Sequence, residues 1–307
     1  MSTVVGIAGL TGKFAQCVAK ELQAYPNVTI KGFCRSPQKL PQAVPEKYNI
    51  RVIQGGFDDE AAVQEFVRGT DVVICCYFGD TDVMNRGQKI LIDACAKEGV
   101  PRYLPSDYAV DYTKIPEGEL FPKESAKIVM NYLVGKKVAG VHVLVGGLIE
   151  TFWSEYFRIF DANTQTITYW GTGDEKWDLT TYETVAAYTA ALAVDKNASG
   201  VFRFSTSSAS GLLMSFTALS RTSSRRTPTT SWPGLPGRTV LLLIDSSEHA
   251  LTVNLRCFTY WCTNGVAHLG DNLDNTKYPD IVPVDMEGFL RARKKEDVAI
   301  ADQQLGF

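Results

Sequence analysis

Three glycines close to the start of the chain have a spacing that suits the binding of phosphate groups. Gly6, Gly9 and Gly12 follow a G-x-x-G-x-x-G pattern, which lies between a short apolar run and an amphipathic helix pattern. Glycine permits a sharp turn and a close approach of the backbone to a pyrophosphate, and the free N–H groups of the following helix attract phosphates. A glycine-rich turn without a ligand is the alternative. The pattern predicts a dinucleotide site formed by Gly6, Gly9, Leu10, Thr11, Gly12 and Lys13.

The residues after the next expected strand indicate which dinucleotide is bound. A site for NAD(H) usually has Asp or Glu there, roughly 20 residues after the glycine loop, to bind the ribose 2′-hydroxyl. This chain instead has Arg35, with Lys39 four residues later. A planar guanidinium group suits a 2′-phosphate, so we expect NADP(H), although an ordinary surface arginine would give the same pattern. Asp58, after the third expected strand, is placed either to bind the adenine edge or to cap a turn.

Strand and helix patterns alternate over the first 150 residues, which is typical of α/β proteins. Short continuous apolar runs indicate strands covered on both faces, at residues 4–8, 28–34, 51–54, 71–77, 101–104 and 141–145. Helical patterns occupy residues 15–22, 61–67, 84–98 and 127–137. We therefore predict an α/β fold with a Rossmann-type doubly wound parallel sheet and a smaller C-terminal substrate subdomain.

The domain organisation follows from the same patterns. Residues 1–150 are predicted to form an NADP(H)-binding Rossmann domain, and residues 151–307 the substrate-binding part. In the second part we expect strands at 167–169 and 201–204 and helices at 184–195 and 285–295. Ligands of open α/β sheets bind outside the carboxyl ends of the strands. By that rule Tyr77, after the fourth strand, and Ser106, after the fifth, belong to the expected cofactor site.

Several of these motifs together resemble the NmrA-like and isoflavone-reductase group of atypical short-chain dehydrogenases. The glycine loop, the basic residue after the second strand and the run Tyr103-Leu104-Pro105-Ser106-Asp107-Tyr108 look like that group, which has a Pro-Ser-Glu-Phe-Gly-type motif at the same place. Residues 169–174 and 260–265 are also similar to fungal NmrA-like proteins. The resemblance covers about 1–204 and 258–290, and it is more specific for the family than for a substrate.

The resemblance implies an NADPH-dependent reductase that acts on a small, aromatic or enone-like secondary metabolite. Members with known activity use a lysine near the start of the helix before the sixth strand, which matches Lys127, with Lys123 as the second candidate. Such a lysine assists proton transfer if its pKa is lowered, whereas a solvated helix lysine is the alternative. The group also includes members that bind NADP without evident catalysis. A non-catalytic NADP(H)-sensing regulator with a protein partner is therefore the competing hypothesis.

A second tyrosine–lysine pattern is misleading. Tyr132 and Lys136 fit the Tyr-x-x-x-Lys pair of ordinary short-chain dehydrogenases, but they lie only nine residues before the sixth expected strand. That end of the helix points away from the carboxyl edge of the sheet. We therefore expect Tyr132 to serve packing or the surface, and the usual tyrosine acid to be missing.

Composition excludes several other classes. The net charge of -3 and the pI of about 5.7 provide no field toward nucleic acid, and no apolar run approaches the ~18 residues of a membrane span. The N-terminus has no signal-peptide pattern. Seven cysteines without C-x-x-C spacing argue against a disulfide framework or a zinc site, and three dispersed histidines suggest no metal. We expect a cytoplasmic protein with a small-molecule substrate.

The stretch 205–256 has an atypical composition. Ser and Thr make up more than half of residues 205–231, and residues 196–244 contain no Asp or Glu. Such a segment rarely buries enough apolar surface to fold by itself. Because family-like sequence resumes near Phe258, we interpret it as a disturbed reading frame. A disordered, phosphorylatable linker around residues 221–230 is the alternative.

Overall fold

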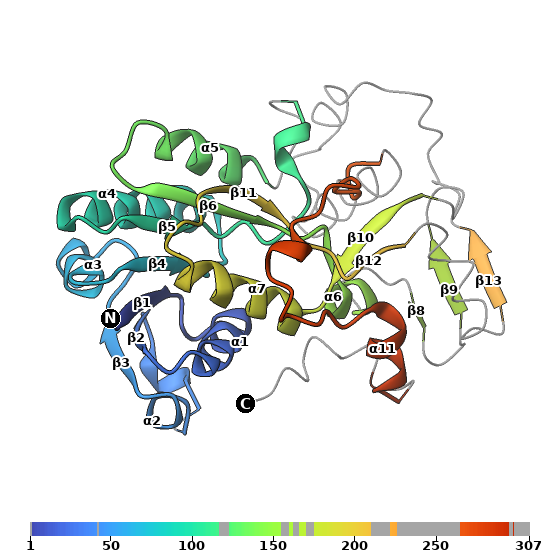
Figure 1. Cartoon of the computed structure of the whole chain (residues 1–307), viewed down its shortest axis with the longest axis horizontal. Coiled ribbons are helices and arrows are strands. Elements are labelled where there is room, and N and C mark those ends of the chain that lie inside the picture. Colours follow the sequence, from blue (N-terminus) through green and yellow to red (C-terminus); the bar gives the residue numbers. More distant parts are fainter. Residues whose placement is uncertain are drawn as a thin grey trace, which may run out of the picture.

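The computed structural model describes residues 2–41, 43–116, 123–154, 160–161, 166–169, 175–209, 222–225, 265–294 and 297. Its main feature is a parallel sheet of seven strands in the order β11-β6-β5-β4-β1-β2-β3 (Figure 1). The strands are β1 (Thr3–Ala8), β2 (Val28–Cys34), β3 (Ile50–Gln54), β4 (Val72–Cys75), β5 (Arg102–Leu104), β6 (Ala139–Leu144) and β11 (Gly200–Arg203). The predicted Rossmann-type sheet is confirmed.

Helices cover both faces of this sheet (Figure 1). On one face α1 (Lys13–Glu21) packs against α7 (Tyr182–Val194). On the other face α3 (Glu60–Val67), α4 (Gln88–Glu98) and α5 (Glu124–Leu133) lie side by side. The short helices are α2 (Ala43–Lys47), α6 (Ile149–Trp153) and α11 (Met286–Arg291), with 3-10 turns at Leu22–Ala24, Pro37–Lys39, Tyr112–Lys114 (η4) and Asn275–Lys277.

Burial on both faces explains the continuous apolar runs in the sequence. All four residues of β4 are buried, and they alternate between the two faces. Val72 and Ile74 join the core beneath α1 and α7, while Val73 and Cys75 join the core beneath α3, α4 and α5. A strand that is covered on both faces has no polar side, as expected for parallel sheets.

The remaining strands form two small sheets. In one, β10 (Trp177–Thr180) lies between β7 (Gly147–Leu148) and β12 (Ser207–Ala209). In the other, β9 (Thr166–Tyr169) lies between β8 (Phe160–Asp161) and β13 (Thr222–Arg225), away from the main sheet (Figure 1). The predicted domain boundary at residue 150 stays a prediction. Both α7 and β11 follow that residue in the sequence and pack with the main sheet.

Several predicted boundaries were wrong. The helix expected at 127–137 begins at Glu124 and ends at Leu133, so Lys127 lies one turn inside it. The helix expected to start at residue 84 begins as a π-helix, Val83–Gly87, before α4. A strand, β13, replaces the expected linker at residues 222–225, while residues 210–221 and 226–256 of the atypical segment lie outside the described residues.

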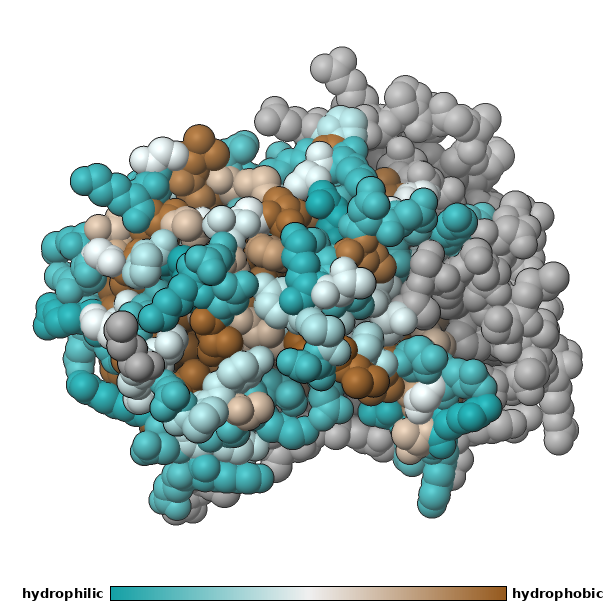
Figure 2. Space-filling model, in the orientation of Figure 1, coloured by the Kyte–Doolittle hydropathy of each residue, from teal (hydrophilic) through white to brown (hydrophobic). Residues whose placement is uncertain are grey.

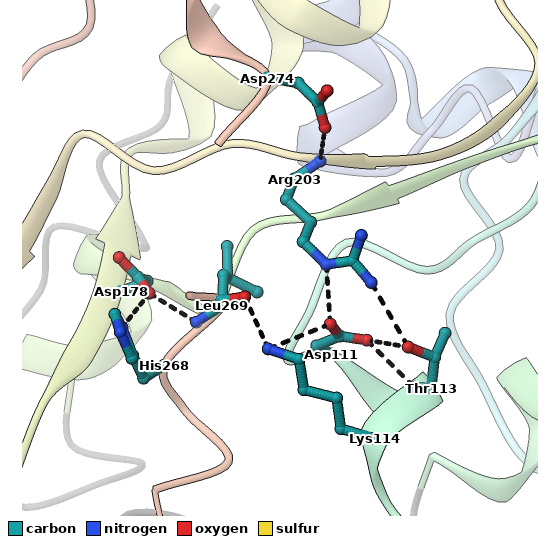
Figure 3. Close-up of polar contacts among 8 residues, drawn as sticks. All are labelled: Asp111, Thr113, Lys114, Asp178, Arg203, His268, Leu269 and Asp274. Carbon is teal, nitrogen blue, oxygen red and sulfur yellow. Dashed lines mark hydrogen bonds and ion pairs between the residues drawn. The ribbon is translucent and has the colours of Figure 1, made fainter. Parts of the chain in front are cut away.

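Two fully buried aspartates lie where residues 265–275 pack against the strands. Asp178 in β10 accepts a hydrogen bond from the Leu269 N–H at 2.6 Å. Asp111, in the loop after β5, accepts one from Nε of Arg203 in β11 at 2.8 Å. Figure 3 shows these contacts together with those of Thr113, Lys114, His268 and Asp274. Asp274 accepts the Arg203 N–H at 2.8 Å, and Lys114 Nζ, which also pairs with Asp111, donates to the carbonyl oxygen of Leu269 at 2.6 Å. Hydrogen bonds therefore fix the C-terminal segment beside β10 and the carboxyl end of β11.

One face of the molecule shows no large hydrophobic patch among the described residues (Figure 2). The face seen in Figure 2 is mainly hydrophilic, with hydrophobic residues in small separate groups. None of the helices in the described ranges is long and apolar enough to cross a membrane.

Arg102 in β5 links the sheet to the end of α7. The side chain is buried, and Nη1 donates to the carbonyl oxygens of Leu192 at 2.8 Å and Asp195 at 2.7 Å. Nη2 donates to the carbonyl oxygen of Ala193 at 2.7 Å. The last carbonyl groups of a helix receive no hydrogen bond from within the helix. The Arg102 side chain supplies donors to three carbonyl groups at the end of α7.

We expect Arg102→Met to lower the free energy of unfolding by about 2–4 kcal/mol, because buried carbonyl groups would lose a charged donor. Urea denaturation followed by circular dichroism measures this. Arg51→Met removes an exposed arginine from β3, at the edge of the same sheet, and should change stability by less than about 0.5 kcal/mol. Equal losses in the two variants would contradict the role given to Arg102.

Candidate cofactor and substrate site

The turn after β1 has a backbone shape that requires glycine. Gly9 has φ +83°, and a Cβ there would lie 2.8 Å from the carbonyl oxygen of Cys76, at the end of β4. The Gly9 and Leu10 N–H groups both donate to the carbonyl oxygen of Phe33, at 2.8 and 3.1 Å. The turn is thus held between the ends of β2 and β4, and it leads directly into α1.

The other loop residues have different positions. A Cβ on Gly6 would lie 3.0 Å from the ring of Phe66, so Gly6 allows α3 to pack closely on β1. The side chain of Leu10 is buried in the core, which leaves only its backbone for a ligand. Gly12 is the N-cap of α1, with Thr11 before it and the exposed Lys13 after it. The N-terminus of α1 is therefore open toward the carboxyl edge of the sheet, where phosphates bind favourably.

The predicted adenosine end lies beyond β2 and β3. Arg35 follows β2 directly and is exposed, and its backbone carbonyl lies 3.4 Å from Nε2 of Gln54 in β3. Lys39 ends the next 3-10 turn and is also exposed. Asp58 is exposed beyond β3, and the N-cap of α3 is Asp59, whose carboxylate accepts from the Ala62 N–H. The Asp58 carboxylate is therefore not the one that caps α3.

The loops after β4 and β5 meet beside the glycine turn. The Ser106 hydroxyl donates to the carbonyl oxygen of Tyr77 at 2.7 Å. The ring of Tyr77 packs on the turn, 3.3 Å from the position that a Cβ of Gly9 would take. Burial raises the pKa of the Tyr77 phenol. This arrangement places Gly9, Tyr77 and Ser106 together between β1 and β4, where the strand order reverses and ligands of such sheets bind.

Sequence reasoning missed Gln88, which fixes Ser106 from behind. Gln88 is buried at the start of α4, and Oε1 accepts hydrogen bonds from the Ser106 N–H at 3.0 Å and the Tyr103 hydroxyl at 3.2 Å. Its Nε2 donates to the carbonyl oxygen of Met84 in the π-helix at 2.8 Å. A polar residue on the inward face of a predicted helix was the available signal. Gln88 joins the helix after β4 to the loop after β5.

The two candidate lysines face different backbone groups. Lys127 donates from Nζ to the carbonyl oxygen of Ile115, in the turn that follows η4. Lys123, the N-cap of α5, donates from Nζ to the carbonyl oxygen of Asp107 at 3.3 Å. Burial lowers the pKa of Lys123, although the Asp107 charge opposes this. The structure thus brings Lys123, rather than Lys127, to the loop after β5.

Tyr132 and Lys136 lie at the far end of α5. The Tyr132 hydroxyl and Lys136 Nζ both donate to the Asp93 carboxylate in α4, at 2.7 and 2.6 Å. These contacts join two helices and lie away from the loops described above, in agreement with the packing or surface role expected for Tyr132.

Comparison with known proteins identifies the first half of the chain. Residues 9–148 match the family model described as NAD(P)H-binding. The chain contains an NAD(P)H-binding domain. The NAD(P)H-binding domain expected from the sequence motifs is thereby confirmed.

One curated relative is an oxidoreductase, aprR, of Aspergillus flavus, which is 26% identical over 189 residues. The match covers 60% of this chain and 62% of the relative, so the chain spans about three fifths of that relative's length. Among solved structures, AtPrR2 with NADP+ and (+)pinoresinol has a TM-score of 0.75 at 16% identity, and an isoflavone reductase has 0.75 at 14%. Each covers 95% of this chain and 99% of its own. These likenesses concern the fold alone, which the described part of the chain shares with both structures.

We expect Gly9→Ala to weaken NADPH binding at least tenfold, because the methyl group would push the turn away from the end of β4. It should also lower the unfolding free energy by more than the cost of about 1 kcal/mol that a positive φ imposes on alanine. Gly69→Ala is the control, since Gly69 has φ +71° but nothing within 4 Å of its Cβ position. Fluorescence titration gives the affinity, and equal behaviour of the two variants would contradict this role of Gly9.

Proposed function

We propose that the chain is an NADPH-dependent reductase of the isoflavone-reductase type, acting on a small, aromatic or enone-like metabolite. The observation that supports this best is the meeting of the glycine turn, the loop after β5 and a partly buried lysine at one edge of the sheet. Similarity to oxidoreductases and reductases supports the reaction class. A cytoplasmic location belongs to the same proposal, and the five described cysteines are free thiols.

The residues at the carboxyl edge fit the parts of NADPH in order. The turn Gly9–Gly12 and the N-terminus of α1 would hold the pyrophosphate, since Gly9 and Gly12 have no side chain and that of Leu10 is buried in the core. Arg35 and Lys39 would bind the 2′-phosphate, with Asp58 near the adenine. Tyr77 and Ser106 would border the nicotinamide end. Bound NADPH supplies the hydride for the reduction.

Reduction of a carbonyl or enone also needs a proton, and a lysine is its source in this proposal. Lys127 matches the lysine position of the family, while Lys123 has the contact with the loop after β5 and the lowered pKa. A lysine whose pKa is lowered toward the working pH transfers a proton more readily than an ordinary one. The ammonium form is the donor, so turnover should fall as the pH rises through the pKa of the active lysine.

The cofactor preference can be tested by titrating the protein with NADPH and with NADH. Arg35→Ala should weaken NADPH binding about 10–100-fold, as expected for a lost charge-assisted contact worth roughly 1.5–3 kcal/mol, and leave NADH affinity unchanged. Arg51→Ala removes the same charge from β3 and should affect neither. Equal affinity of the wild type for both dinucleotides would contradict the assignment of Arg35.

The catalytic lysine can be tested by NADPH consumption over a panel of enones and quinones. Substitution of the proton donor, Lys123→Ala or Lys127→Ala, should lower kcat about 100-fold or more. Lys136→Ala, on the same helix but paired with Asp93, should retain full turnover. Full turnover in both candidate variants removes these lysines from the mechanism. A wild type that binds NADPH but turns over no substrate favours the non-catalytic sensor.

A further inference from the structure

Three ionisable side chains meet in the core behind the loop after β5. Asp107 follows Ser106 in that loop, Tyr112 lies in η4, and His142 lies in β6. All three are buried. Oδ2 of Asp107 lies 2.8 Å from Nδ1 of His142 and 3.0 Å from the Tyr112 hydroxyl, and those two groups are 3.1 Å apart. We call these residues the Asp107 cluster.

Tyr112 and His142 fix the position of the Asp107 carboxylate by hydrogen bonds. Tyr112 donates its hydroxyl proton to Asp107, and burial together with the Asp107 charge raises the pKa of the Tyr112 phenol. A proton on Nδ1 lets His142 donate to the same oxygen, in either the neutral or the charged ring. The other oxygen, Oδ1, has no hydrogen-bond partner within the described ranges. Side chains from η4 and β6 thus bind one oxygen of the Asp107 carboxylate.

The backbone carbonyl group of Asp107 contacts the candidate catalytic lysine. Its backbone carbonyl accepts the hydrogen bond from Lys123 Nζ, and its negative charge acts on that ammonium group. Within the described part of the chain, the titratable groups that act on Asp107 are Cys75 of β4, Tyr108 of the same loop, Tyr112 of η4, His142 of β6 and Lys123 before α5. Two members of this set can be positively charged, Lys123 and His142, and His142 is positive only when both ring nitrogens are protonated.

We propose that Asp107, gripped by Tyr112 and His142, is a positioning residue for Lys123, fixing the loop against the lysine and supplying the negative charge that keeps its ammonium group there. The inference rests on the proposed reductase function, in which Lys123 is one of two candidate proton donors. Two separate effects follow. The charge of Asp107 favours the protonated lysine, and the grip of Tyr112 and His142 fixes where the lysine lies.

Both effects can be read from one labelling curve. Trace acetic anhydride reacts only with neutral amines, so the labelling rate of Lys123, followed by mass spectrometry against pH, has a midpoint at its pKa. The plateau above the midpoint reports how accessible the amine is. Asp107→Asn removes the charge and should move the midpoint down by about one unit, a roughly tenfold faster labelling below it. Tyr112→Phe retains the charge and should raise the plateau at least about twofold.

Tyr132→Phe is the matched control. It also removes a phenol that donates to an aspartate beside α5, but at the exposed end, and it should leave both the midpoint and the plateau of Lys123 unchanged. An unmoved midpoint in folded Asp107→Asn overturns the inference. If that variant does not fold, an unmoved plateau in Tyr112→Phe overturns it instead.

Labelling requires neither substrate nor turnover, which separates this inference from the proposed function. A shifted midpoint in a protein that reduces no substrate upholds the coupling and removes the reductase. Turnover with an unmoved midpoint and plateau removes the coupling alone. Where turnover is found, the high-pH limb of kcat should move down in Asp107→Asn by the same amount as the labelling midpoint, a result that a purely structural role would not give.

Discussion

The contact between the turn after β1 and the end of β4 sets the position of everything at the carboxyl edge. Gly9 packs its backbone on the carbonyl oxygen of Cys76, where any side chain would collide. Leu10 then enters the core against Gly32 of β2, which has no side chain to oppose it. Because the turn is held from both sides, α1 must start at one point and present its N-terminus there. The phosphate site is thus a consequence of strand packing.

The loop after β5 is fixed in a different way, by buried polar side chains. Gln88 holds the Ser106 N–H from the helix side, and the Asp107 cluster holds the next residue from the β6 side. Buried polar groups need partners, and a fully bonded set specifies one geometry. A reactive site benefits from this, since small displacements of a catalytic group cost rate. One buried oxygen without a described partner, Oδ1 of Asp107, lies within this otherwise satisfied set.

The sequence predicted the features that depend on local chemistry. All seven strands of the main sheet and the glycine turn were found because double burial and positive φ leave direct marks on residue type. The start of α5 was misplaced, although Glu124 is an acidic residue of the kind that favours a first turn. Gln88 and His142 were missed for a physical reason. A polar side chain within an apolar pattern has meaning only once its partner is known, and those partners lie 18 and 35 residues away.

The misplaced start of α5 also changes how the two lysines relate. Because the helix begins at Glu124, Lys123 stands before the first turn and reaches back to Asp107, while Lys127 reaches Ile115. Ile115 follows η4, the turn that contributes Tyr112 to the Asp107 cluster. Lys127 therefore holds the segment that grips Asp107, and Asp107 in turn faces Lys123. The two lysines thus reach the segment between β5 and α5 at different points, and Lys123 is the one that contacts Asp107.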